Sequence, residues 1–162
     1  MSSRHGGRKK RQGDRPIAEN RKARREIEVE QTIEAGLVLR GSEVKSLREG
    51  KASLNDSYAR EEGGELYLIN ANISAYDGAH SRNHRPQQKR KLLLHRSEIN
   101  KLAAAVQRGG KTLLALKIYF NKAGRAKVLL GLGKGRKLVD KRQVEKARDW
   151  ARDKARLLKN KR

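Results

Sequence analysis

The chain has 162 residues, of which 41 are Lys or Arg and 18 are Asp or Glu, so its formal net charge is +23. The absence of cysteine excludes a disulfide framework, a zinc–thiolate site and a cysteine nucleophile. No apolar run approaches the roughly 20 residues that cross a bilayer, and the first residues lack the apolar segment of a secretory signal, so we expect a cytoplasmic protein.

The excess of positive charge indicates a polyanionic partner. So many like charges repel one another in a compact fold unless a polyanion neutralises them. We therefore expect the protein to bind nucleic acid; an anionic membrane or an acidic protein is the alternative.

Charge and apolar pattern divide the chain into three parts. Residues 1–16 hold six basic residues and almost nothing apolar, so they cannot bury enough surface to offset the entropy of ordering and are predicted to be a disordered arm. Nearly all core-like pattern lies in 17–132, the predicted folded body. Residues 133–162 are predicted to be a basic tail.

Short strands dominate the body. Over 26–35, apolar residues alternate with acidic or polar ones, which predicts a half-buried strand with one solvated face. Gly63 and Gly64 have the composition of a hairpin turn between two further strands. The other predicted strands are 57–61, 66–69, 91–94, 112–120 and 127–132, with a turn over 121–124.

Two helices are predicted between the strands. Ser42 is a good N-cap and Gly50 a good C′ residue for the first, whereas the second covers about 97–108 and ends at Gly109-Gly110. A mainly β fold of about six short antiparallel strands with small helices favours an OB-like barrel, because closure removes exposed strand edges. A two-layer α+β sandwich is the alternative.

Glycines alternate with other residues over 131–137. The segment lacks the spacing of a Walker A motif, so it does not predict a nucleotide site. We expect its glycines to let the backbone approach a surface closely, and its Lys and Arg side chains to neutralise phosphates there. A flexible connection between body and tail is the plainer interpretation, and the two are compatible.

The tail has helical spacing but a weak apolar face. Its apolar stripe recurs every three or four residues from Val144 to Leu158, yet three of its five members are Ala. Acidic residues precede basic ones by three positions, which adds modest helix stability. We predict a tail that is disordered or helical and that becomes helical against a polyanion.

No enzymatic or metal-binding pattern is present in the sequence. His80 and His84 precede Pro86 in a polar stretch without a carboxylate cluster, so we expect no metal, no cofactor and no catalysis. His95 is interpreted as a surface or RNA-facing imidazole. The few aromatic residues disfavour base-by-base stacking and favour recognition of a folded RNA through its shape, phosphates and 2′-hydroxyls.

Several blocks of sequence resemble, in order, the SmpB family of SsrA-binding proteins. The resemblance covers about 17–158. The matching blocks are 17–24, 34–37, 41–48, 50–52, 56–58, 90–94, 133–137 and 140–142.

The resemblance implies a barrel that binds transfer-messenger RNA (tmRNA, also called SsrA RNA) and delivers it to ribosomes stalled on messages without a stop codon. In this process, trans-translation, the tail enters the mRNA channel and the decoding centre, where it replaces codon–anticodon pairing. The implied partners are tmRNA and the ribosome with its 16S rRNA. No DNA or membrane partner is expected, and the protein is expected to act as a monomer.

The resemblance also assigns residues. Those implied to bind tmRNA are Asn20, Arg21, Arg24, Glu34, Leu93 and Lys127. Those implied to act in the ribosome-facing tail are Lys134, Arg136, Lys137, Asp140, Lys141, Arg142 and Trp150.

The residues by themselves allow other interpretations. The first three would be a basic lead-in to a strand, Glu34 a solvent-facing acid, Leu93 a core residue and Trp150 an anchor onto protein. Glu43, at a helix N-terminus, is interpreted as structural.

Two positions depart from the family pattern. Ile27 stands where relatives often have tyrosine, which removes an RNA-stacking contact, and Val139 stands where they often have histidine.

Two rival functions remain at this point. A generic basic ribosomal or initiation protein would bind ribosomal subunits regardless of tmRNA and would not need Asp140, Lys141 and Arg142. An RNA-processing enzyme would need a nucleophile or carboxylate cluster, and the sequence offers neither.

Overall fold

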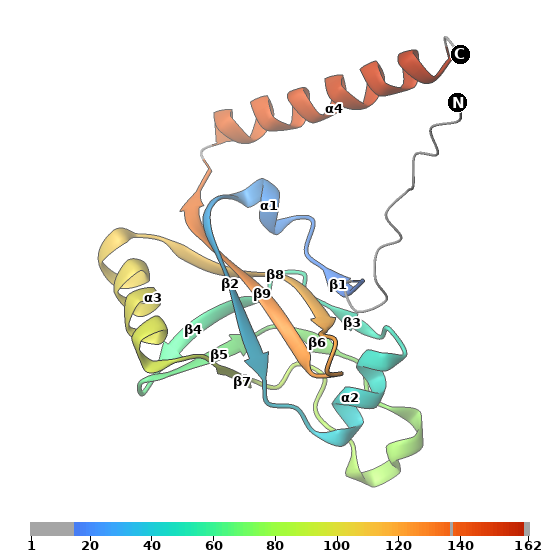
Figure 1. Cartoon of the computed structure of the whole chain (residues 1–162), viewed down its shortest axis with the longest axis vertical. Coiled ribbons are helices and arrows are strands. Elements are labelled where there is room, and N and C mark those ends of the chain that lie inside the picture. The colour runs from blue at the N-terminus through green and yellow to red at the C-terminus, as the bar shows by residue number, and fades with distance from the viewer. Residues whose placement is uncertain (1–14, 137, 161–162) are drawn as a thin grey trace, which may run out of the picture.

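The structure is a computed structural model that describes residues 15–136 and 138–160. Its main feature is an antiparallel sheet in which six strands close into a ring (Figure 1). The last strand of the ring pairs back with the first, so the predicted barrel is confirmed and the open sandwich is wrong. In ring order the strands are β8 (Thr112–Phe120), β4 (Tyr58–Glu62), β5 (Glu65–Ile69), β7 (Arg90–Leu93), β2 (Ile27–Leu37) and β9 (Ala126–Gly135).

Several short elements escaped prediction because their patterns are too brief to be periodic. Strand β1 (Pro16–Glu19) pairs with β8, so Pro16 belongs to the sheet and not to the arm. The rest of the predicted arm, apart from Arg15, lies outside the described residues. The other unpredicted elements are α1 (Ala23–Glu26), β3 (Ala52–Ser53), β6 (Asn72–Ile73) and the 3-10 segment η2 (Asp77–Arg82).

Helix α2 (Gly41–Arg48) begins earlier than predicted. Its N-cap is Arg40, whose backbone N–H donates to the Glu43 carboxylate at 2.7 Å. The proposed cap, Ser42, instead hydrogen-bonds through its hydroxyl to His84 Nδ1 at 2.9 Å. The stop is as predicted, because Gly50 has a φ of 74° that disfavours other residues.

Helix α3 (Arg96–Gly109) follows the prediction closely. Ile99 and Leu102 are buried against the barrel core, and Gly110 ends the helix in the left-handed conformation. Each fully buried Leu or Ile side chain contributes about 1.5–3 kcal/mol relative to an exposed one. The barrel interior is lined mainly by Leu66, Leu68, Leu92, Leu113, Ile118, Val128 and Leu130.

A buried ion pair connects α2 to the barrel. Arg90 Nε donates to Glu43 Oε1 at 2.7 Å, and both side chains are 1% exposed. The Arg90 guanidinium also donates to the carbonyls of Ala71, Pro86 and Gln88. Glu43 is therefore structural, as the sequence indicated, although its main partner is Arg90.

Strand β2 does not keep one apolar face as predicted. Its pairing with β9 shifts between Val29 and Gln31, so Glu30 is an extra residue that forms a β-bulge. The bulge reverses the alternation of side chains. Ile33 therefore faces the core with Ala35, whereas Ile27 lies on the outer face of the barrel with Val29.

Strand β9 continues beyond the predicted end of the body. It pairs with β2 as far as Gly135, so the glycine-rich segment is mostly strand and not a flexible connection. A Cβ on Gly133 would lie 1.9 Å from the Glu28 carbonyl oxygen, and one on Gly131 would lie 2.9 Å from the Leu116 side chain. The surface that these glycines approach closely is thus the barrel itself.

The tail forms one helix, α4 (Leu138–Asn160), which leaves the barrel at the end of β9 (Figure 1). The predicted stripe is exposed from Ala147 to Leu158, and Trp150 is 73% exposed. Three acid–base pairs have the predicted spacing: Glu145 with Arg148, Asp149 with Arg152, and Asp153 with Arg156. Of these, Asp149 and Arg152 form an ion pair, with Asp149 Oδ1 3.8 Å from an Arg152 guanidinium nitrogen. None of the described helices is long and apolar enough to cross a membrane.

Candidate nucleic-acid interface

The outer face of β7, β2, β9 and β8 brings together residues from distant parts of the sequence. Leu93 pairs with Gly36, Gly36 with Lys127, and Lys127 with Tyr119. Residues directly opposite one another in a sheet share a face, so these four positions form one row across the barrel. Leu93 is 52% exposed in this row. It is therefore a surface residue, contrary to what an apolar residue in a strand would suggest.

A second row lies next to the first. Glu34 pairs with Leu129, and Leu129 with Lys117, on the same outer face. The Glu34 carboxylate accepts a hydrogen bond from the Tyr119 hydroxyl, and Lys117 Nζ lies 5.1 Å from the centre of the Tyr119 ring. Glu34 therefore positions the Tyr119 ring through a hydrogen bond, and the same ring lies under the Lys117 ammonium group. We call the two rows together the strand face.

The strand face has an apolar floor and a basic rim. A hollow of about 290 Å³ lies at its edge, lined among others by Leu93, Phe120, Arg125 and Lys127. Leu93 can lie across the sheet because Gly36 has no side chain; a Cβ there would be 3.2 Å from Leu93 Cβ. An exposed leucine beside two cations suits the sugar and phosphate surface of a folded nucleic acid.

The N-terminal motif is divided between the interior and the surface. Asn20 is 2% exposed, and its side chain donates to the Leu54 carbonyl at 2.9 Å and accepts from the Ala23 N–H at 3.0 Å. Its polar atoms are thus used inside the protein, and its part in RNA binding stays a prediction. Arg21 and Arg24, which follow it, are exposed.

Arg136 is part of the barrel, although the sequence assigned it to the tail. Its backbone N–H donates to the Glu26 carbonyl at 2.8 Å, and its Nε donates to the Ile27 carbonyl at 3.3 Å. It lines a hollow of about 320 Å³ on the outer face of β2, together with Arg24 and Thr32. Ile27 lines the same hollow and is buried, so it offers no stacking contact.

The remaining tail residues lie along the end of β9 and the first turns of α4. Lys134 is exposed on β9, opposite Glu28. Asp140 and Arg142 are exposed, and Lys141 is half-buried. Lys137 and the Val139 side chain lie outside the described part of the chain.

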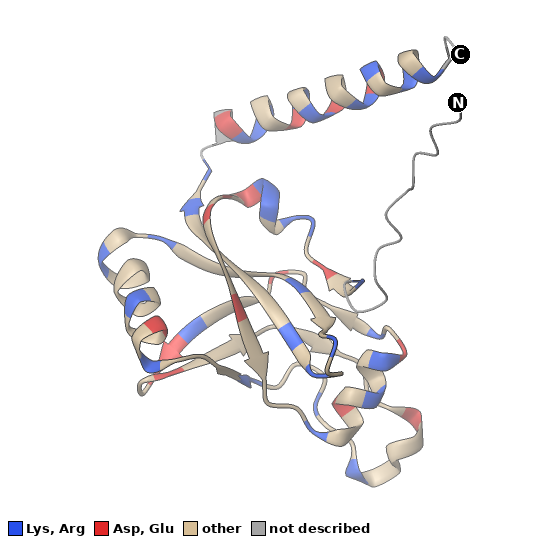
Figure 2. Cartoon of the chain, viewed as in Figure 1, with Lys and Arg blue, Asp and Glu red and all other residues tan. Residues whose placement is uncertain are grey.

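The acidic residues of the barrel are largely neutralised by neighbours. The hydrogen bond from Lys111 lowers the pKa of Glu30, and that from Lys89, followed by that from Arg60, lowers the pKa of Glu62. Figure 2 shows further basic residues on α1, α2 and α4. The surface left for a partner is therefore positive, as a nucleic-acid interface requires.

The histidines do not form a metal site. His84 is buried and lies between Ser42 and the Ile73 carbonyl, to which its Nε2 is 2.8 Å distant. Within residues 15–136 and 138–160 there is no group of three or more His, Asp or Glu residues placed to hold a metal ion. His84 is thus a structural residue of the loop that precedes β7.

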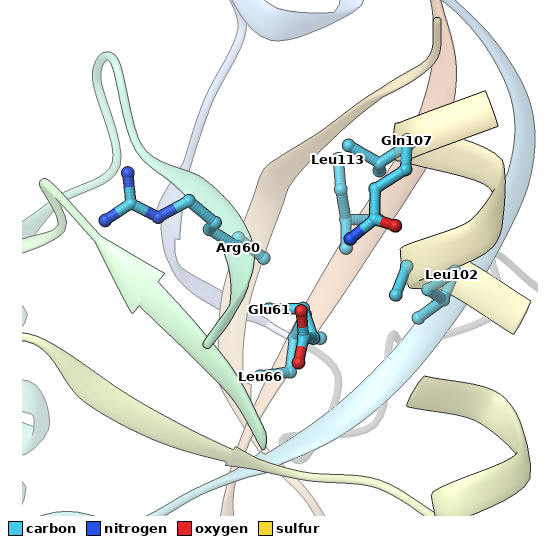
Figure 3. A pocket seen from close by; sticks show the side chains of 9 residues that line it. Arg60, Glu61, Leu66, Leu102, Gln107 and Leu113 are labelled. Atoms are coloured by element: carbon cyan, nitrogen blue, oxygen red, sulfur yellow. The ribbon is translucent and has the colours of Figure 1, made fainter. Parts of the chain in front are cut away.

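A separate cleft of about 270 Å³ lies between α3 and strands β4, β5 and β8 (Figure 3). It is lined mainly by apolar side chains, among them Leu66, Leu102 and Leu113, and Arg60 points away from it. It therefore holds no set of groups for acid–base or nucleophilic chemistry.

The fold and the strand face place this protein in the class of small, basic OB-like barrels that bind nucleic acid on their outer strands. The chain belongs to the SmpB family, because the family model described as SmpB protein matches residues 17–160. The resemblance seen in the sequence is thus confirmed.

Relatives that match most of the chain are described as SsrA-binding proteins. An SsrA-binding protein of Hyphomonas neptunium is 59% identical over 143 residues, which cover 88% of this chain and 89% of that protein. One of Mesorhizobium japonicum is 58% identical, over 90% of this chain and 92% of that protein. A solved structure described as "tmRNA-SmpB: a journey to the center of the bacterial ribosome" is 52% identical, with a TM-score of 0.63 over 74% of this chain and 84% of that one.

Proposed function

We propose that this protein binds tmRNA and acts with it on the ribosome in trans-translation. The proposal is supported by relatives named SsrA-binding protein and by the similar chain in a tmRNA–SmpB structure on the ribosome. The protein would deliver tmRNA to stalled ribosomes so that they are rescued and the unfinished peptide is tagged. It would bind RNA without catalysing a reaction, and it would work in the cytoplasm, where translation takes place.

The two parts of the molecule have separate tasks in this proposal. The barrel, from Pro16 to Gly135, binds the tRNA-like domain of tmRNA. Helix α4 enters the vacant mRNA channel and reaches the decoding centre. At about 1.5 Å per residue, its 23 residues span about 35 Å, a length suited to a channel.

The observation that carries the proposal is the convergence of Glu34, Leu93 and Lys127 on the strand face. Lys127 and the neighbouring Lys117 would neutralise phosphates, and Leu93 would pack on a ribose or base. Glu34 would position Tyr119 or accept a hydrogen bond from a base amino group. Asn20 would act indirectly, by fixing the turn that presents Arg21 and Arg24.

The tail residues would contact the ribosome. Asp140, Lys141 and Arg142 lie on the first turn and a half of α4, where they would replace the pairing of codon and anticodon. Lys134 and Lys137 would contact rRNA phosphates just before the helix, and Trp150 would insert against rRNA farther along it.

Truncation after Lys137 tests the division of tasks. We expect the shortened protein to bind tmRNA with the parent's affinity, because β9 remains complete, and to lose peptide tagging on stalled ribosomes. Affinity and tagging would be measured on the same preparations. Loss of tmRNA binding together with tagging, or tagging that persists, would contradict the two-part proposal.

The substitution Lys127→Ala tests the strand face. It should weaken tmRNA binding and reduce the slope of log affinity against log salt by about 0.7–0.9, the effect of one lost phosphate contact. Lys101→Ala on α3 removes the same charge from an exposed site away from the strand face and should change neither value. A generic ribosomal protein would instead bind ribosomal subunits equally with and without tmRNA.

A further inference from the structure

The hollow beside α1 contains two arginines that come from opposite ends of the chain. Arg24 belongs to α1, and Arg136 follows the last residue of β9. Thr32 of β2 and the buried Leu116 also line the hollow. The sequence places Arg24 in the RNA-binding motif and Arg136 in the ribosome-facing tail, whereas the structure places both around one depression.

Arg136 is held in position before any ligand arrives. Its backbone N–H extends the β2–β9 pairing by one hydrogen bond to Glu26, and its Nε donates to the Ile27 carbonyl. Neither bond uses the terminal nitrogens of the guanidinium, and within residues 15–136 and 138–160 these nitrogens have no protein acceptor. A half-buried guanidinium fixed through Nε can offer its remaining N–H groups to an anion without much loss of entropy.

The charges around the hollow favour a phosphate as the ligand. Glu28 is the one carboxylate among the residues that line it, and Glu28 pairs across the ladder with Lys134. Among the lining residues, Arg24 and Arg136 therefore leave an excess of one positive charge over Glu28. Arginine binds phosphate through parallel N–H groups, which are stronger than neutral hydrogen bonds.

The hollow lies on the same outer face of β2 as the strand face. The bulge at Glu30 turns Val29 to the outer side of β2, where Thr32 and Glu34 follow it. A nucleic acid that lies over Leu93 and Lys127 can therefore reach Arg24 and Arg136 along a single strand of the same barrel.

We propose that Arg24 and Arg136 bind backbone phosphates of the tmRNA that occupies the strand face, so that Arg136 belongs to the tmRNA site and not to the ribosome site. This inference rests on the proposed function. Because Arg136 lies two residues before α4, the bound RNA also holds the base of the helix. The tail is thereby directed by tmRNA before it meets the ribosome.

Charge-removing substitutions in the full-length protein test this site. Arg136→Gln and Arg24→Gln should each weaken tmRNA binding by about tenfold, the value of one charge-assisted hydrogen bond, and each should lower the salt slope by about 0.7–0.9. Arg108→Gln on α3 is the matched control and should leave tmRNA affinity and tagging unchanged. Arg142→Gln should lose tagging at full tmRNA affinity.

The outcomes separate the site from the proposed function. If Arg136→Gln behaves like Arg142→Gln, Arg136 is a ribosome residue and the inference is wrong, while the proposed function stands. If the parent binds tmRNA no better than an unrelated RNA of equal length, yet Arg136→Gln still weakens binding to both, the function fails and the phosphate site stands. Arg136→Lys, which keeps the charge, should retain most of the salt slope; a loss as large as in Arg136→Gln would assign the effect to folding and overturn the inference.

Discussion

The barrel and helix α4 both carry an excess of basic residues, but their structures are maintained in different ways (Figure 2). In the barrel, every strand of the ring has two neighbours, and the core is closed by α3. In α4, the apolar stripe and Trp150 are exposed, and most acid–base pairs are absent. A high positive charge is therefore compatible with both kinds of structure. The barrel has a packed core of its own without RNA, whereas α4 makes few tertiary contacts.

The largest contrast is expected from the buried ion pair. Glu43→Gln leaves the Arg90 guanidinium buried without its counter-charge, so it should lower the free energy of unfolding by about 3–5 kcal/mol. Leu158→Ala on α4 should change it by less than about 0.5 kcal/mol, because Leu158 is exposed. Urea unfolding monitored by circular dichroism measures both; similar losses in the two variants would remove the contrast.

A smaller effect is expected where strands β2 and β9 are closest. Gly133→Ala places a methyl group against the Glu28 carbonyl and should cost about 1–3 kcal/mol through backbone displacement. Gly135→Ala is the matched control, since nothing lies within 4 Å of its Cβ position. Equal stability of the two variants would contradict this, and would mean that the β2 backbone at the bulge moves to accommodate the methyl group at no cost in free energy. The measurement is again the urea midpoint.

Removal of α4 should affect stability less than either change in the barrel. Truncation after Lys137 is expected to leave the free energy of unfolding within about 0.5 kcal/mol of the parent's, because the stripe of α4 is exposed. The far-ultraviolet circular dichroism should lose the signal of a 23-residue helix. A large loss of stability would reveal that α4 supports the barrel.

The smallest effect concerns the pH dependence of a surface pair on the barrel. The hydrogen bond from Lys91, and then that from Tyr67, lowers the pKa of Glu65. The resulting stability is complete above the unfolded pKa of about 4.3 and is lost as the pH falls through the lower folded value. Glu65→Gln should therefore lose less stability than the parent between pH 5 and acid conditions, in urea titrations over that range; parallel profiles would contradict this.

Local patterns predict the elements of the barrel but not its contacts. The hairpin at Gly63-Gly64 and the end of α3 at Gly109-Gly110 follow from residues adjacent in sequence, and both were predicted. The bulge at Glu30 was missed because strict alternation over 26–35 looks uninterrupted in the sequence. The extra residue becomes visible only when β2 is paired with β9, more than a hundred positions away.

The same limit applies to the candidate site. Nothing local distinguishes Leu93 from a core leucine, and its exposure depends on Gly36 of the neighbouring strand. The resemblance assigned Asn20 to RNA binding, whereas in the structure its side chain donates to the Leu54 carbonyl inside the protein. The resemblance assigned Arg136 to the tail, whereas its hydrogen bonds to the Glu26 and Ile27 carbonyls place it on the barrel. Family resemblance supplied Glu34, Leu93 and Lys127; the pairing of strands showed why these three belong together.

Trp150 has one more consequence. It is the single tryptophan of the sequence and lies on α4, 73% exposed, so the barrel contributes no indole emission. The tryptophan emission of the unlabelled protein therefore reports on the tail alone. Its wavelength and polarisation can follow the proposed passage of α4 from water into an RNA-lined channel in real time, without a dye attached to the molecule.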